Sequence, residues 1–177
     1  CFGDKSMTRT VYVNGDYLPE GEARVSIFDR GFLMADGVYE VTSVLEGKLI
    51  DFDGHVKRLE RSLKELEMSC PVNSEELLAM HRELVSRNGI EQGMIYLQVT
   101  RGVAPRDHVM PEGIEPTVFM MCNPMKPATA EQRHHGVTCT TARDFRWERG
   151  DIKSVSLLGN VLARQMSADH GAFETIM

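Results

Sequence analysis

The chain has 177 residues with a formal net charge of −6, and its 42% hydrophobic and 26% charged residues are ordinary for one large globular domain or two small ones. It lacks a basic stripe interleaved with aromatic residues, so we expect no nucleic-acid binding. Its apolar runs are far shorter than the roughly 20 residues of a membrane span, so we expect no membrane insertion. The spacing of the cysteines and histidines predicts free thiols in a reducing compartment and no metal site.

Alternating apolar residues predict an antiparallel sheet in the first two thirds of the chain. A hairpin over residues 10–18 turns at Asn14-Gly15, a two-residue turn signal. Further strands are expected over residues 24–28, 38–45, 48–52, 93–101 and 117–122. The strands over 38–45 and 48–52 are expected in the centre of the sheet, and residues 29–37 form a loop or a short helix.

Helical spacing predicts two helices between these strands. Asp53 is the expected N-cap of the first, whose apolar stripe includes Leu59 and Leu63. The second covers residues 75–87 and carries His81 on its apolar side. The segment 102–116 contains three prolines and is predicted to be a long loop of the kind that often carries function.

The second part of the chain is predicted to be incomplete. We expect a helix over residues 158–170 and a strand over 172–177 that has no partner after it. The chain therefore reads as the front part of a longer protein. The predicted division is an N-terminal extension or remnant over 1–9, a small α/β domain over 10–122, a linker over 123–129, and the start of a larger domain over 130–177.

Four groups of residues occur in a characteristic order. They are Asp29-Arg30-Gly31 with Asp36-Gly37-Val38-Tyr39-Glu40, then His55-x-x-Arg58-Leu59, then Tyr96 to Gly102 with Pro105-Arg106-Asp107-His108, and finally Arg146-Trp147 with Asp151-Ile152-Lys153-Ser154. Together they resemble the fold-type IV pyridoxal-phosphate enzymes, most closely the D-amino-acid (D-alanine) aminotransferases. The resemblance runs from about residue 11 to the last residue. It implies an α/β multi-domain (α+β) fold with a small N-terminal domain built on a mainly antiparallel sheet, pyridoxal 5'-phosphate as cofactor, a homodimer and a cytoplasmic protein.

The resemblance also implies roles for the residues of the cofactor site. Lys153 would form the Schiff base with the cofactor, and its freed amine would then move protons as general base and acid. Such a lysine must be partly neutral near pH 7, for which burial or the nearby cations Arg146 and Arg149 are candidate causes. Arg58 would clamp the cofactor phosphate. The alternatives without a function are that Lys153 is an ordinary lysine and that Arg58 lies on a solvated helix face.

Three further residues would hold the α-carboxylate of the substrate. These are Tyr39, Arg106 and His108, and the resemblance implies that the two loop residues come from the neighbouring subunit. A guanidinium supplies both the positive charge and the planar donor pair that a carboxylate requires. As alternatives, Tyr39 is a packed sheet tyrosine and His108 a loop histidine exposed to water.

The function implied is transamination between D-alanine or D-glutamate and pyruvate or 2-oxoglutarate. Alternatives within the same fold are an aminodeoxychorismate lyase, an (R)-selective amine transaminase and a branched-chain transaminase. An alternative of another class is a catalytically inactive N-terminal fragment. The glutamate that the resemblance places at the cofactor ring nitrogen is expected beyond residue 177, because Glu174 comes too early and in a different context.

Overall fold

A computed structural model of the chain describes residues 9–144 and 146–177. The chain divides into two compact units. The first runs to Met125 and also includes Ile152–Val155, and the second contains Lys126–Asp151 and Ser156–Met177. The domain boundaries predicted above stay a prediction, but the return of Ile152–Val155 to the first unit was not foreseen from the sequence.

A six-stranded sheet forms the first unit, with the order β2-β1-β6-β5-β3-β4 and antiparallel pairing throughout. The strands are β1 (Thr10–Val13), β2 (Asp16–Pro19), β3 (Gly37–Leu45), β4 (Lys48–Leu49), β5 (Gln92–Thr100) and β6 (Thr117–Pro124). The hairpin turn at Asn14-Gly15 is confirmed, with positive φ at both residues. The strand predicted over 48–52 is much shorter than expected, and β4 lies at the edge of the sheet.

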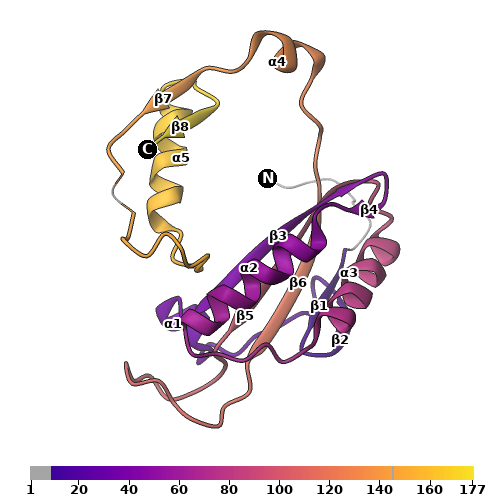
Figure 1. Cartoon of the computed structure of the whole chain (residues 1–177), viewed down its shortest axis with the longest axis vertical. Coiled ribbons are helices and arrows are strands. Elements are labelled where there is room, and N and C mark those ends of the chain that lie inside the picture. Colours follow the sequence, from indigo (N-terminus) through magenta and orange to yellow (C-terminus); the bar gives the residue numbers. More distant parts are fainter. Residues whose placement is uncertain (1–8, 145) are drawn as a thin grey trace. The chain divides into compact units, whose positions relative to one another are not determined.

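Two helices, α2 (Phe52–Glu65) and α3 (Ser74–Asn88), cover one face of this sheet (Figure 1). That face is buried because apolar residues at alternate strand positions meet the apolar stripes of the helices. The largest fully buried apolar side chains are Leu59 and Leu63 of α2, Leu84 of α3, Ile95 of β5 and Met120 of β6. Asn73 and Glu76 form a capping box at the start of α3. By contrast, α2 begins after Asp51 rather than at the predicted cap Asp53, which lies in the first turn.

The connection between β2 and β3 differs from the prediction in one place. Residues 24–28 form no strand, and Val25, Ile27 and Phe28 are more than half exposed. The following helix, α1 (Arg30–Met34), was one of the two structures expected there. Asp29 caps it through Gly31 N–H, and a side chain at Gly31 would clash with Thr100, because an added Cβ would lie 2.2 Å from Thr100 Cγ2.

The second unit consists of α4 (Ala130–His135), β7 (Cys139–Thr141), α5 (Leu158–Asp169) and β8 (Glu174–Ile176). Strands β7 and β8 pair in parallel, so the predicted last strand has a partner that precedes it in the sequence. The Thr140 and Thr175 hydroxyls lie 2.7 Å apart between the two strands, and the Thr175 hydroxyl also donates to the Ala163 carbonyl of α5. Over the residues that the structure describes, each helix lacks the length or the apolar character needed to cross a bilayer.

His81 lies in the core of the first unit and is 2% exposed. Its Nδ1–H donates to the Leu77 carbonyl at 2.7 Å, and its ring meets the Phe52 ring edge-on at 5.1 Å. Burial lowers the pKa of His81 from 6.5 to about 4, because the apolar surroundings disfavour the imidazolium. The folded protein therefore holds this imidazole neutral.

His81→Gln is expected to flatten the acid dependence of the stability of the first unit. Between pH 6.5 and about 4 the unfolded chain binds a proton at His81 that the folded chain excludes, so the free energy of unfolding falls as the pH falls. This loss amounts to about 3 kcal/mol across the window and is absent in the variant. Urea unfolding at several pH values measures it, with His134→Gln on an exposed helix as control. An unchanged slope in His81→Gln would contradict the assignment.

Candidate functional site

Lys153 lies on a short segment that pairs with the beginning of β3. Tyr39 N–H donates to the Lys153 carbonyl at 3.0 Å, and Val155 N–H donates to the Gly37 carbonyl at 3.1 Å. Val38 and Ser154 form an antiparallel bridge between these two bonds. The segment is also tied to α2, because Lys153 N–H donates to the hydroxyl of buried Ser62 at 3.3 Å.

The backbone of this segment turns tightly at Lys153, because Ser154 N–H donates to the Ile152 carbonyl at 2.8 Å. Ile152 is 4% exposed and packs in the core, whereas the half-buried Lys153 carries its amine to the Tyr39 ring. Lys153 Nζ lies 4.0 Å from the centroid of this ring, within the range of a cation–π interaction. Tyr39 in turn stacks on Tyr96, with ring centroids 5.4 Å apart and planes inclined by 22°. The amine and the phenol predicted as site residues are therefore adjacent.

Tyr96 supports this aromatic pair from the neighbouring strand. Its hydroxyl donates to Gln98 Oε1 at 2.7 Å, and its ring also lies against Phe119 of β6. Burial raises the pKa of Tyr96 to about 12, with a smaller contribution from Tyr39. Tyr96 therefore remains a neutral hydrogen-bond donor at any physiological pH.

Arg58, on α2, is held by a carboxylate from the sheet. Glu40 of β3 is 2% exposed and accepts from Arg58 Nε and Nη2 at 2.6 Å each. Glu40 also contacts His55 Nδ1 at 2.8 Å. Burial alone would raise the pKa of Glu40, but the hydrogen bonds from Arg58 and His55 hold it below its ordinary value. The pair raises the pKa of Arg58, first through the hydrogen bond to Glu40.

This arrangement uses one edge of the Arg58 guanidinium and leaves the rest of it available. The side chain is 43% exposed, and Nη1 has no hydrogen-bond partner among the described residues. The Tyr39 phenol also contributes electrostatically to the raised pKa of Arg58. Arg58 and Lys153 therefore share Tyr39 as a neighbour. The first unit thus brings together an amine, an aromatic ring and a fixed cation. This donor set fits an aldehyde that carries a phosphate.

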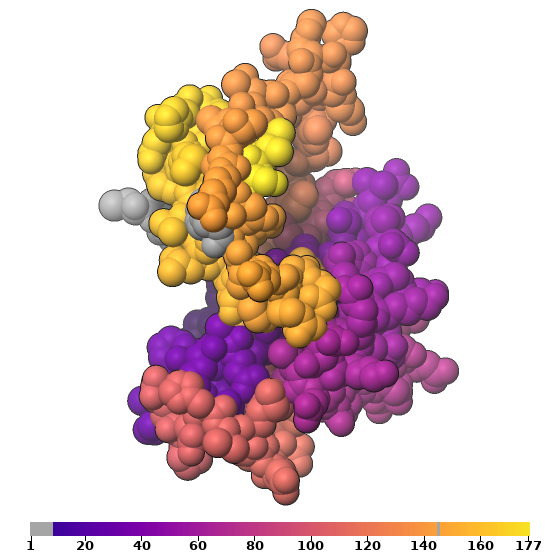
Figure 2. All heavy atoms as spheres, turned by 60° about the vertical axis from the view of Figure 1, so that its left-hand side comes forward, coloured from indigo at the N-terminus to yellow at the C-terminus, as the bar shows by residue number. Residues whose placement is uncertain are grey.

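The loop between β5 and β6 carries Arg106 and His108, and both side chains are exposed. The loop lies on the surface of the first unit beside the indigo segment that contains α1 (Figure 2). No hydrogen bond or ion pair joins either side chain to another of the described residues. Among the described residues, the hydrogen bond that joins residues 105–110 of this loop to the rest of the chain is the one that the Asp107 carbonyl accepts from Arg30.

Arg146 and Arg149, the candidate cations near Lys153, each have an aspartate two residues away as partner. Arg146 pairs with Asp144 at 2.9 Å and Arg149 with Asp151 at 2.9 Å, and all four side chains are exposed. These pairs belong to the second unit. In the first unit, the Lys153 amine contacts the Tyr39 ring.

Sequence reasoning assigned no role to Glu40, His55 or Ser62. A signal for Glu40 existed, because it shares the buried face of β3 with Val38 and Val44, where a carboxylate requires a partner. Ser62 had no comparable signal. A hydroxyl inside an amphipathic helix is common, and its partner is a backbone N–H far along the chain.

Comparisons with known proteins agree with this fold. Residues 37–177 match the sequence pattern of the family described as amino-transferase class IV. The D-alanine aminotransferase of Staphylococcus haemolyticus is 39% identical over 166 residues, which are 94% of this chain and 59% of that protein.

Solved structures give the same picture. The branched-chain amino acid aminotransferase of Escherichia coli has a TM-score of 0.84 at 18% identity and is matched over 96% of this chain and 59% of its own. The 4-amino-4-deoxychorismate lyase of Pseudomonas aeruginosa has a TM-score of 0.73 at 26% identity, over 94% of this chain and 60% of its own.

The predicted fold, a mixed α/β architecture with a mainly antiparallel sheet, is confirmed by these likenesses. The chain spans 59% of the length of the curated relative described above. Since the family pattern extends over residues 37–177, which include both β3 and the segment of Lys153 that pairs with it, this chain belongs to the class IV aminotransferases.

Proposed function

We propose that this chain contributes the reactive lysine, the phosphate arginine and the substrate-binding loop of a pyridoxal-phosphate-dependent D-amino-acid aminotransferase. Enzymes of this family use pyridoxal 5'-phosphate. The observation that carries the proposal is the Lys153 amine 4.0 Å from the Tyr39 ring, in the same unit as the partly free guanidinium of Arg58. The activity is proposed for a protein that extends this chain to the length of its relatives, because this chain covers 59% of them.

Each of the chain's own residues has a defined task in this proposal. Lys153 holds the cofactor through its amine, and after substrate binding it moves a proton to and from the substrate Cα. Arg58 binds the phosphate through Nη1, while Glu40 fixes the opposite edge of the guanidinium. The bound cofactor supplies the electron sink for the reaction. Tyr39 would hold the substrate carboxylate together with Arg106 and His108, and its ring lies 4.0 Å from Lys153 Nζ.

The substrates proposed are D-alanine and D-glutamate, with pyruvate and 2-oxoglutarate as acceptors. The name of the Staphylococcus haemolyticus relative supports this choice, since it is 39% identical to this chain. Arg106 and His108 would receive the substrate carboxylate in a homodimer, where their exposure on one subunit makes them available to the other. A cytoplasmic location accords with such a reaction and is likewise proposed.

A second candidate is an aminodeoxychorismate lyase reaction. It is favoured by the likeness to the Pseudomonas aeruginosa lyase, which is 26% identical to this chain. The two reactions differ in their need for an acceptor. Pyruvate formed from aminodeoxychorismate without an added oxo acid would identify the lyase, whereas dependence on an oxo acid would identify the transaminase.

Lys153 is expected to carry a pyridoxyl group after incubation with pyridoxal 5'-phosphate and reduction with borohydride. Peptide mapping locates the group, and Lys153→Ala should abolish it, whereas Lys57→Ala on exposed α2 should not. If the full-length protein carries no pyridoxyl group on Lys153, the proposal is wrong. An adduct present there but absent from the 177-residue chain would identify this chain as an inactive piece.

Arg106→Ala is expected to lower kcat/KM for D-alanine roughly ten- to a hundredfold, the range of one lost hydrogen-bonded ion contact. The absorbance of the bound cofactor should not change, because Arg58 and Lys153 hold it. Steady-state kinetics and a visible spectrum measure the two effects, with Arg133→Ala as a surface control. Loss of cofactor absorbance in Arg106→Ala would contradict the assigned role.

Glu40→Gln is expected to weaken the binding of pyridoxal 5'-phosphate about tenfold, because the guanidinium of Arg58 loses the charged partner that fixes it. Binding of pyridoxal, which has no phosphate, should be unchanged. Titration followed by absorbance measures both, with Glu60→Gln on the exposed face of α2 as control. Equal weakening of both ligands would show that Glu40 acts on the fold rather than on phosphate binding.

A further inference from the structure

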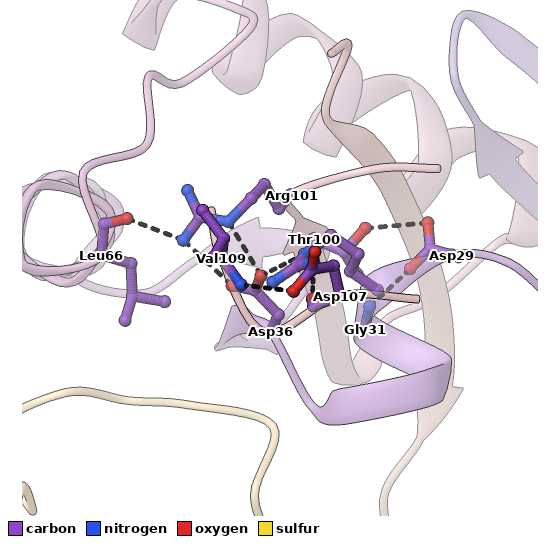
Figure 3. Close-up of polar contacts among 9 residues, drawn as sticks. Asp29, Gly31, Asp36, Leu66, Thr100, Arg101, Asp107 and Val109 are labelled. Carbon is purple, nitrogen blue, oxygen red and sulfur yellow. Dashed lines mark hydrogen bonds and ion pairs between the residues drawn. The ribbon is translucent and has the colours of Figure 1, made fainter. Parts of the chain in front are cut away.

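A buried ionic network lies where α1, β3 and β5 meet. Asp36, which immediately precedes β3, accepts from Arg30 Nε at 2.7 Å and from Arg101 Nε at 2.8 Å. Arg101 also donates through Nη2 to the Leu66 carbonyl, so it spans from Asp36 to the end of α2 (Figure 3). Arg30 and Arg101 are both buried. Burial alone would raise the pKa of Asp36, but the hydrogen bonds from Arg101 and Arg30 hold it below its ordinary value.

A second carboxylate fixes the start of α1 next to this network. Asp29 is 2% exposed and accepts from Gly31 N–H at 2.8 Å and from the Thr100 hydroxyl at 2.9 Å. Arg30 N–H in addition donates to the Gly102 carbonyl. The backbone on both sides of Arg30 is therefore fixed at the start of α1, so its long side chain begins from a fixed position.

The free end of Arg30 reaches the loop between β5 and β6. Arg30 Nη1 donates to the Asp107 carbonyl at 2.6 Å. Among the described residues, this is the hydrogen bond that connects residues 105–110 to the rest of the chain. Within the loop, Val109 N–H donates to Asp107 Oδ1 at 3.2 Å, as Figure 3 shows.

The bond from Arg30 ends between the two proposed substrate-binding residues of the loop. Asp107 is the residue between Arg106 and His108, and its carbonyl belongs to the peptide group that leads into His108. Fixing this carbonyl fixes the plane of that peptide and thereby the backbone from which both exposed side chains start. Arg30 shares the Asp36 carboxylate with Arg101, and its Nη1 donates to a backbone carbonyl.

We propose that Arg30, held by Asp36, is a positioning residue that sets the direction of Arg106 and His108 for substrate carboxylate recognition. This inference rests on the proposed function for the role of Arg106 and His108. It goes beyond that proposal because it names the device inside one chain that orders an otherwise exposed loop. A loop that must serve a site outside its own chain requires such a device, since the site cannot order it in advance.

Arg30→Lys is the first test, because it retains the charge opposite Asp36. A lysine has one nitrogen and cannot replace both Nε and Nη1 in their separate directions. In the chain as described, backbone ¹⁵N relaxation is expected to give order parameters for residues 106–109 that fall from about 0.85 towards 0.6 or less. Arg87→Lys, in an exposed pair with Glu83, is the matched control and should leave the loop unchanged.

Arg30→Met provides a second variant in which Arg101 still pairs with Asp36, and it should loosen the loop at least as much. Unchanged loop order parameters in both folded variants overturn the proposal, whatever the enzyme activity is. If one variant fails to fold, the other decides.

Kinetics in the protein of full length separate this inference from the proposed function. Arg30→Lys is expected to raise KM for D-alanine about tenfold with a smaller effect on kcat, and to leave turnover of a primary amine without a carboxylate unchanged. If Arg106→Ala impairs D-alanine but Arg30→Lys does not, the positioning role is overturned and the proposed function stands. If Arg106→Ala has no effect, the carboxylate-binding role of the loop fails, and the positioning role fails with it.

Discussion

The candidate site depends on one backbone pairing, that of Ile152–Val155 with the start of β3. Two hydrogen bonds and one bridge connect segments that lie far apart in sequence, and Ile152 secures the pairing by entering the core. Full burial of such a side chain is worth about 1.5–3 kcal/mol. The buried Ile152 and the tight turn that Ser154 N–H closes onto the Ile152 carbonyl hold Lys153 between them, with its amine against the Tyr39 ring. The geometry of the amine is thus a consequence of the packing of its neighbour.

The carboxylates of Glu40 and Asp36 each fix one side of an arginine guanidinium. Glu40 engages Nε and Nη2 of Arg58, and Asp36 engages Nε of Arg30, so that in both cases Nη1 remains for another partner. For Arg30 that partner is the Asp107 carbonyl, and for Arg58 it is the proposed phosphate. Buried ion pairs add little net stability, because desolvation offsets the attraction, but they define geometry. Both networks therefore serve orientation more than stability.

The amino-acid pattern predicts the sheet and the two covering helices well, because alternation and helical spacing encode which face is buried. The turn at Asn14-Gly15 is local and was predictable for that reason. The prediction of a strand over residues 24–28 was wrong. They form none, because a strand needs a neighbour, and among the described residues the pairing at that place is the single bridge from Asp29 to Val103.

The site was predictable in part. The resemblance supplied Lys153, Arg58 and Tyr39, and the structure places them in one unit. It could not supply the partners that fix them. The bond from Arg30 ends on a backbone carbonyl 77 residues away, and any residue type at position 107 other than one that distorts the backbone would offer the same acceptor. Contacts to backbone carbonyls therefore cannot be predicted from the pattern of side chains.

The position of the lysine segment also sets an order of events in biosynthesis. Every strand and helix of the six-stranded unit lies before Met125, and Ile152–Val155 arrives later from the ribosome. Domains form from the N-terminus as the chain emerges. The sheet edge at Tyr39 can therefore form before Lys153 emerges from the ribosome, and the lysine segment then docks onto that edge. A ligand that needs both residues can be captured only after this last docking, which makes its binding a late step in the maturation of the protein.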